Sequence, residues 1–187
     1  MIPRKMMYEA DKGKLIRHFE RLNEDDRYLR FGYPANDDMM KKYIKSSLET
    51  FGSTDMWFLV ADGENIVGSV HVAVMGDKAE MGFTVEKKYR GKGLGQDLFS
   101  RGATWAMMKG AKVLFTQCLS ENKVMQHIAK KNGMTVVTLD AGEKEATLKA
   151  SKGTLRAYYD DQFFDNLAFV DMSIHKQWKY FDNLLNL

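Results

Sequence analysis

The spacing of apolar residues is helical in the first quarter of the chain. Apolar residues at positions 15, 16, 19 and 22 lie on one face of a helix, which we expect to end near Asn23. A short strand over residues 5–9 is expected before it. A second short helix is expected up to Phe31, and a third, capped by Asn36 or Asp37, up to position 51.

From Trp57 onward the pattern becomes that of strands. Compact apolar runs over 57–61, 66–74 and 79–86 are separated by Asp-Gly and Gly-Asp turn signals. We therefore predict an antiparallel meander of three strands. The third strand leads directly into a glycine-rich loop.

After that loop, helical and strand patterns alternate. A helix is expected from Leu94 to Lys109, and a second one, capped by Ser120 or Asn122, closes at Gly133. Strands are expected over 113–118, 134–139 and 146–150. This order predicts an α+β fold with helices on a single mixed, mostly antiparallel sheet.

The glycine-rich loop reads Tyr89-Arg90-Gly91-Lys92-Gly93-Leu94-Gly95. A strand that passes through glycines into a helix leaves several backbone N–H groups unpaired at the positive end of the helix dipole, which favours an anion. Glycines let a phosphate approach the backbone closely. The dinucleotide fingerprint does not match, because position 96 is Gln, and no P-loop ending is present.

Composition excludes several function classes. The 187 residues suffice for one domain, and the net charge of +3 is too small to indicate a nucleic-acid or membrane partner. We see no apolar run that could span a membrane, no signal-peptide core and no metal-ligand spacing. The single cysteine, Cys118, excludes an internal disulfide and favours a cytoplasmic location. We expect Cys118 to be a buried strand thiol rather than a nucleophile.

Arg90, Gly93 and Gly95 fill the pattern Arg/Gln-x-x-Gly-x-Gly/Ala, the pyrophosphate signature of the GNAT superfamily of acetyl-CoA-dependent N-acetyltransferases, which this chain resembles. The order of elements is also similar to that of the GNAT fold. Segments 19–31, 79–85 and 120–134 resemble the Pat-type protein lysine acetyltransferases most. The resemblance implies a GNAT-like domain over 1–152. Residues 153–187 keep helical spacing, and we expect a C-terminal helical extension that packs on the domain, forms a homodimer interface or lines the acceptor groove.

The resemblance also implies where acetyl-CoA, or coenzyme A, binds. Main-chain N–H groups of the loop would hold the pyrophosphate, and the strand before it would pair with the pantetheine arm. The N–H of Val85 would donate to the acetyl oxygen. Asn122 resembles a cofactor-contacting asparagine of the family, although a helix cap explains it nearly as well. The implied cofactor-binding residues are Phe83, Thr84, Val85, Arg90, Gly91, Lys92, Gly93, Leu94, Gly95 and Asn122.

Glu80 is the candidate general base. A lysine with a pKa of about 10.4 is almost fully protonated at neutral pH, so a carboxylate near the acceptor would remove its proton. Pat-type enzymes resemble this chain in carrying a glutamate in that context; a solvated strand charge is the alternative, and Glu86 is a weaker candidate. Many GNAT members carry a tyrosine acid where this chain has Ala129, so that acid is absent here. We expect nearby His127 to be an ordinary surface residue.

These observations predict an enzyme that transfers acetyl directly from the thioester to a primary amine, either a protein lysine or a small amine. The alternative is a catalytically silent, CoA-binding regulatory or interaction module. The sequence does not identify the acceptor, because loops and helices build acceptor grooves.

Overall fold

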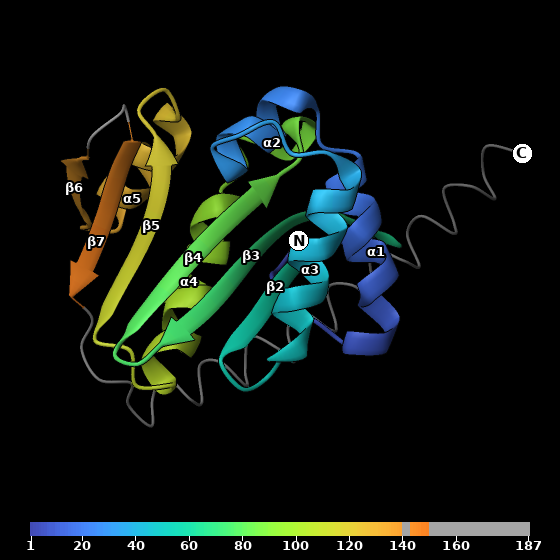
Figure 1. The fold of residues 1–187 in the computed structure, drawn as a ribbon, viewed down its shortest axis with the longest axis horizontal. Helices are drawn as coiled ribbons and strands as arrows, with labels where there is room; N and C mark the ends of the chain where they lie inside the picture. The colour runs from blue at the N-terminus through green and yellow to red at the C-terminus, as the bar shows by residue number, and fades with distance from the viewer. Residues whose placement is uncertain (140–142, 150–187) are drawn as a thin grey trace, which may run out of the picture.

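The computed structural model describes residues 1–139 and 143–149, and these form one seven-stranded sheet with five α-helices (Figure 1). The strand order is β1-β2-β3-β4-β5-β7-β6. The strands are β1 (Arg4–Lys5), β2 (Asp55–Asp62), β3 (Asn65–Met75), β4 (Lys78–Val85), β5 (Val113–Leu119), β6 (Thr135–Thr138) and β7 (Glu143–Lys149). The helices are α1 (Tyr8–Glu20), α2 (Glu24–Phe31), α3 (Asp37–Glu49), α4 (Leu94–Met108) and α5 (Lys123–Lys131), with a 3-10 turn, η1 (Lys87–Tyr89), before α4.

The predicted fold class is confirmed. Strands β2, β3 and β4 form the antiparallel meander, and among the described strands β4 and β5 are the one parallel pair. That pair is short, since its register extends only from Lys78↔Val113 to Glu80↔Phe115. The long crossover through α4 makes a parallel pairing possible here.

Two hydrophobic cores lie on opposite faces of the sheet. On one face α1 and α3 pack over β2 and β3, with Phe19 against Trp57 at a centroid distance of 5.8 Å. On the other face α4 packs over β3 and β4, and Leu98 of the helix and Met81 of the sheet are both fully buried in this second core. Figure 1 shows α1 and α3 in front of the sheet and α4 behind it. Each of these three helices therefore buries an apolar stripe, whereas α2 has no fully buried residue.

The strand predicted over residues 5–9 is wrong in extent. Strand β1 ends at Lys5, and α1 already begins at Tyr8. The carboxylate of Asp11 accepts a hydrogen bond from the Met7 N–H at 2.7 Å, which caps the helix early. The same carboxylate pairs with Arg4 at 2.6 Å, and this buried ion pair joins β1 to α1.

None of the helices within residues 1–139 and 143–149 combines the length and the hydrophobicity that a membrane-spanning helix needs. The same residues contain no cluster of histidine, cysteine or acidic side chains suited to a metal ion. The predicted extension over 153–187 lies outside the described residues.

Candidate functional site

The two middle strands of the sheet separate after a short contact. Beyond Glu80, β4 no longer pairs with β5, which pairs on its other side with β7 along its whole length. Figure 1 shows β4 and β5 diverging toward the end of the sheet where α2 lies. The second half of β4 therefore has a free edge inside the sheet.

The peptide groups on this free edge alternate in direction. The N–H of Glu86 donates to Val67 at 2.9 Å, so Glu86 faces β3, and neighbouring residues point away from β3. The N–H groups of Val85 and Phe83 consequently face the opening between β4 and β5. A side chain confirms this direction, because Arg90 Nε donates to the carbonyl of Val85 at 2.9 Å. The opening thus carries main-chain donors of the kind that an extended ligand or a carbonyl oxygen can use.

The loop after β4 presents a second set of donors. Gly91 and Gly93 have φ angles of 74° and 83°, in the left-handed region that favours glycine, and α4 begins directly after them. Within the described residues, no acceptor is bound by the backbone N–H groups of 91–95. These free amides stand at the positive end of the 15-residue helix α4 and form a preorganised site for a diphosphate.

Arg90 serves the loop through its side chain, since its N–H already donates to the Lys87 carbonyl at 3.3 Å. Its Nη2 pairs with Asp26 Oδ1 at 2.5 Å, while its Nε holds the Val85 carbonyl. The guanidinium therefore joins the glycine-rich loop to both α2 and β4. Lys92 behaves differently, since its Nζ lies 5.3 Å from the centroid of the Tyr89 ring and does not line the groove.

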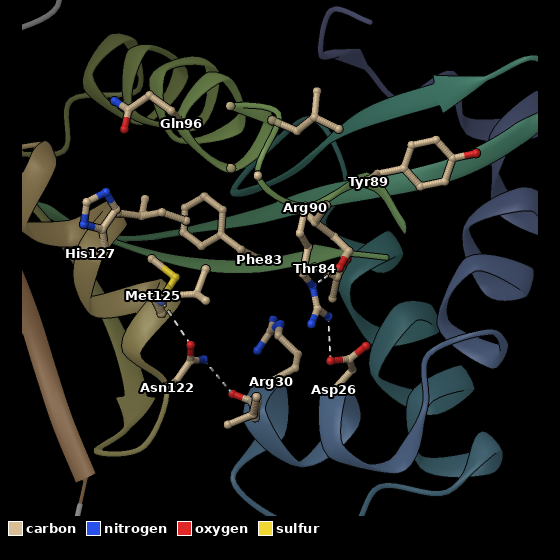
Figure 2. Close-up of a pocket in the computed structure, with 18 of the residues that line it drawn as sticks. Asp26, Arg30, Phe83, Thr84, Tyr89, Arg90, Gln96, Asn122, Met125 and His127 are labelled. Atoms are coloured by element: carbon tan, nitrogen blue, oxygen red, sulfur yellow. Dashed lines mark hydrogen bonds and ion pairs between the residues drawn. The ribbon is translucent and has the colours of Figure 1, made fainter. Parts of the chain in front are cut away.

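The opening and the loop form one groove of about 370 Å³, bordered by β4, α2, the start of α4 and α5 (Figure 2). Most of the predicted cofactor-binding residues line it. These are Phe83, Thr84, Val85, Arg90, Gly91, Gly93, Leu94, Gly95 and Asn122. Glu80 does not line it; this residue is half-buried at the point where β4 and β5 separate.

Asn122 combines a structural and a groove position. Its Oδ1 accepts from the Met125 N–H at 3.0 Å and caps α5. Its Nδ2 lies 3.4 Å from the carbonyl of Leu29 on the opposite side of the groove, a contact that Figure 2 also shows. The helix-cap interpretation is therefore correct, and it places the side chain at the mouth of the groove.

Glu86 is bound too firmly to act as a mobile base. Burial raises the pKa of its carboxyl, but hydrogen bonds from His18 and Arg21 outweigh this, and the pKa lies below its ordinary value. The distances from Glu86 Oε1 are 3.0 Å to His18 Nδ1 and 2.8 Å to Arg21 Nη2. A carboxylate of this kind is a poor proton acceptor.

Proton donors for a leaving thiolate are few around the groove. Burial, together with a hydrogen bond of 2.7 Å to Asp62, raises the pKa of Tyr89 to about 12, and its hydroxyl points away from the groove (Figure 2). Ala129 is buried, as its sequence position predicts. His127 is exposed as expected, but it also borders the groove, which the sequence analysis did not anticipate.

Arg30 is the most important groove residue that the sequence analysis missed. It belongs to α2, which contributes Leu22, Asp26, Leu29 and Arg30 to the lining together with the preceding turn. No local sequence signal marks it, because its position depends on how α2 packs against β4.

The comparisons with known proteins agree with this geometry. Residues 7–135 match the family model described as acetyltransferase (GNAT) domain. This match extends over more than half of the chain. The chain belongs to the GNAT acetyltransferase family. The predicted family is thereby confirmed, and the groove occupies the place where the sequence resemblance located the cofactor.

Solved GNAT structures are similar to this fold at low sequence identity. The GNAT domain of S. lividans PAT has a TM-score of 0.70 and 19% identity, over 79% of this chain and 89% of that chain. Ribosomal-protein-alanine N-acetyltransferase from Brucella melitensis has a TM-score of 0.62 and 12% identity, over 80% and 100%. The acetyltransferase yncA from Salmonella typhimurium, solved with acetyl-CoA, has a TM-score of 0.62 and 15% identity, over 82% and 96%. A search of the curated proteins gave no match.

Proposed function

We propose that this GNAT protein transfers an acetyl group directly from acetyl-CoA to a primary amine. The observation that carries the proposal is that two sets of free main-chain N–H groups lie one after the other along a single groove. Free amides at 91–95 suit a diphosphate, and the free edge of β4 suits the extended arm that follows it. Acetyl-CoA has both chemical parts in this order, and the similar yncA structure contains it.

Bound acetyl-CoA supplies an activated thioester, and the chain has to position it and stabilise the charge that develops. The N–H groups of Val85 and Phe83 face the opening, and we assign one of them to the thioester oxygen, on which negative charge accumulates during attack. They lie two residues apart on the strand, about 6.8 Å, so a single oxygen cannot bind both. Preorganised main-chain donors are effective there because they need no reorganisation. Removing such a donor in other enzymes costs about a hundredfold or more in rate.

The acceptor amine has to lose protons while the new N–C bond forms and the C–S bond breaks. We propose that Glu80 takes a proton from the amine, directly or through a water. It is half-buried at the point where the strands separate and has no strong ion-pair partner within the described residues. In that arrangement its carboxylate remains available as an acceptor. The thiolate has a pKa of about 8.5 in its free form and can take a proton from solvent.

A protein lysine and a small amine both remain acceptors under this proposal. The similar structures include the GNAT domain of a PAT protein and an enzyme named for ribosomal-protein alanine, so the fold is shared by proteins named for different roles. On the side of α2 the groove is lined by Leu22, Asp26, Leu29 and Arg30.

The experiment is release of free thiol from acetyl-CoA in the presence of small amines, amino acids and lysine-containing peptides. The proposal expects thiol release that depends on an amine, together with a product heavier by one acetyl group. Tight binding of acetyl-CoA without turnover on any acceptor would instead support the silent CoA-binding module.

A further inference from the structure

Arg30 places a guanidinium against the backbone of β4 at the inner part of the groove. A Cβ placed on Gly82 would overlap this guanidinium, so glycine at that position gives it room on the strand. Gly82 immediately precedes Phe83, whose N–H faces the opening. Figure 2 shows the Arg30 side chain directed from α2 toward β4.

A chain of hydrogen bonds holds this guanidinium in place. Arg30 Nη2 donates to Tyr43 Oη at 2.5 Å, so the single Tyr43 hydroxyl proton is directed to His71 Nδ1, which lies 2.8 Å away. His71 Nε2 then carries the other proton and donates to Asp55 Oδ1 at 2.8 Å. The His71 ring is stacked on Trp57 at a centroid distance of 4.6 Å. The arginine is therefore anchored to the buried core, unlike a surface arginine.

The carboxylate of Glu80 acts electrostatically on the same Tyr43 and His71 side chains as Arg30 does, but it forms no direct ion pair with the guanidinium in the part of the chain that the structure describes. Within the described residues, no ion pair joins Arg30 to a carboxylate, and Asp26, the nearest acid on the same helix face, pairs with Arg90. The Nε of Arg30 is buried without any hydrogen-bond partner. Its guanidinium instead lies over two aromatic rings, at 5.1 Å from Phe31 and 5.3 Å from Tyr43. A rigid, unpaired guanidinium in a groove is suited to bind a carboxylate.

We propose that Arg30 binds a carboxylate carried by one of the two substrates, next to the reacting thioester. This inference rests on the proposed function, because it requires the thioester to lie beside Phe83. Two sources have the required chemistry. One is the far end of a short dicarboxylic acyl group, as in succinyl-CoA, and the other is the α-carboxylate of a free amino acid acceptor.

The electrostatics favour an anionic substrate over a purely cationic one. A fixed positive charge near the reaction centre repels a protonated lysine or polyamine and attracts a carboxylate. A hydrogen-bonded, partly desolvated arginine–carboxylate pair is worth about ten- to a hundredfold in affinity.

The first arm of the test compares two acyl donors of nearly equal shape. Butyryl-CoA and succinyl-CoA differ in that a terminal carboxylate replaces a methyl group. Titration calorimetry measures the affinity of each for the full chain without requiring catalysis. If the carboxylate that Arg30 binds belongs to the acyl group, succinyl-CoA is expected to bind at least tenfold more tightly than butyryl-CoA.

The second arm compares acceptors with acetyl-CoA as the donor. Each amino acid is paired with its decarboxylated amine, for example lysine with cadaverine and tyrosine with tyramine, and thiol release gives kcat/KM for both. If the carboxylate that Arg30 binds belongs to the acceptor, kcat/KM is expected to be at least tenfold higher for one or more amino acids than for the matched amines.

Variants then assign the preference to Arg30. In Arg30→Gln the preference is expected to fall below threefold, while Arg30→Lys, which keeps the charge and tests for a merely structural role, retains part of it. Lys112→Gln makes the same charge change on an exposed side chain at the opposite end of the sheet and is expected to keep the full preference.

The inference is overturned if the wild-type chain shows no carboxylate preference in either arm, a result that depends on no variant. A preference that survives in a folded Arg30→Gln protein also overturns it. Failure of the proposed function is distinguishable, since acetyl-CoA would then not be consumed with any acceptor, whether or not it binds. Turnover of acetyl-CoA without any carboxylate preference would reject the role of Arg30 alone.

Discussion

His18 Nδ1 lies 3.0 Å from Glu86 Oε1, although 68 positions separate these two residues. The other ring nitrogen of His18 lies 2.8 Å from Thr84 Oγ1, which in turn is 2.6 Å from Ser69 Oγ. This fully buried imidazole thereby joins α1 to the end of β4. It holds this end of β4 from the face of the sheet that α1 covers, which helps the free edge keep its shape without a neighbouring strand.

Glu86→Gln tests this structural role. The variant weakens the hydrogen bonds with His18 and Arg21, and hydrogen bonds to a charged group contribute about 1.5–3 kcal/mol. We expect the free energy of unfolding at pH 7, measured with denaturant, to fall by about 1–2 kcal/mol. Because the folded-state pKa of Glu86 is below its ordinary value of 4.5, this difference is complete above pH 4.5 and shrinks as the pH falls through the folded pKa. A difference that persists unchanged at pH 2–3 would be inconsistent with this origin.

His71 predicts a separate dependence of stability on pH. Burial lowers the pKa of His71 below its ordinary value of 6.5, and the hydrogen bond with Asp55 only partly opposes this. Below pH 6.5 the unfolded chain therefore binds a proton that the folded chain does not, so stability decreases as the pH falls from 6.5 toward the folded pKa. We expect the free energy of unfolding to decline more steeply between pH 6.5 and 5 in the wild type than in His71→Asn. Parallel curves for the two proteins would show that His71 does not titrate in this way.

Glu80→Gln examines the proposed base. We expect kcat for transfer to fall at least a hundredfold, because the variant cannot accept the proton of the amine. The Kd for acetyl-CoA should change less than twofold, because Glu80 does not line the groove proposed to bind the cofactor. Glu49→Gln is the matched control, since it makes the same chemical change on an exposed side chain of α3 that does not line the groove, and it should retain transfer within a fewfold. Transfer by Glu80→Gln at the wild-type rate would remove Glu80 from the mechanism.

Cys118 distinguishes direct transfer from a covalent intermediate. The thiol is buried, 7% exposed, and burial raises its pKa above the ordinary value, although Lys144 opposes this. A protonated, inaccessible thiol is a poor nucleophile. We expect Cys118→Ala to retain transfer within about twofold, and intact-protein mass spectrometry with acetyl-CoA to show no acetyl adduct at Cys118. An adduct that an added amine discharges at the rate of turnover would contradict direct transfer.

Much of the fold could be predicted because local signals and tertiary structure agree. The turns after Asp62 and Met75 define the meander, and the glycines of the loop mark the start of α4. The cap at Asn36 also lies where the sequence places it, and its side chain accepts a hydrogen bond from the Met39 N–H, three positions later. In these segments the residue type itself determines the backbone geometry.

The remainder depends on contacts between distant segments. Asp11 begins α1 early because it also binds Arg4, a pairing that no local pattern shows. Arg30 enters the groove because α2 packs on β4 at a glycine, and Glu80 is separated from the groove lining because the strands diverge directly after it. The sequence therefore indicated the chemistry of the loop, whereas the surroundings of the reacting atoms required the structure.

The most direct test of the account is a titration of the isotope-labelled protein with CoA, followed by amide NMR, for wild type, Gly93→Ala and Gly76→Ala. Both glycines have a positive φ, 83° and 62°, and space for a methyl group, so each substitution costs about 1 kcal/mol of backbone strain, but Gly76 lies in a distant hairpin turn. We predict saturable shifts concentrated at residues 91–95 in the wild type and in Gly76→Ala, and binding at least tenfold weaker in Gly93→Ala. Saturation by CoA that leaves the amides of 91–95 unmoved, or equal affinity in the two variants, would contradict the assignment of this loop as the diphosphate site.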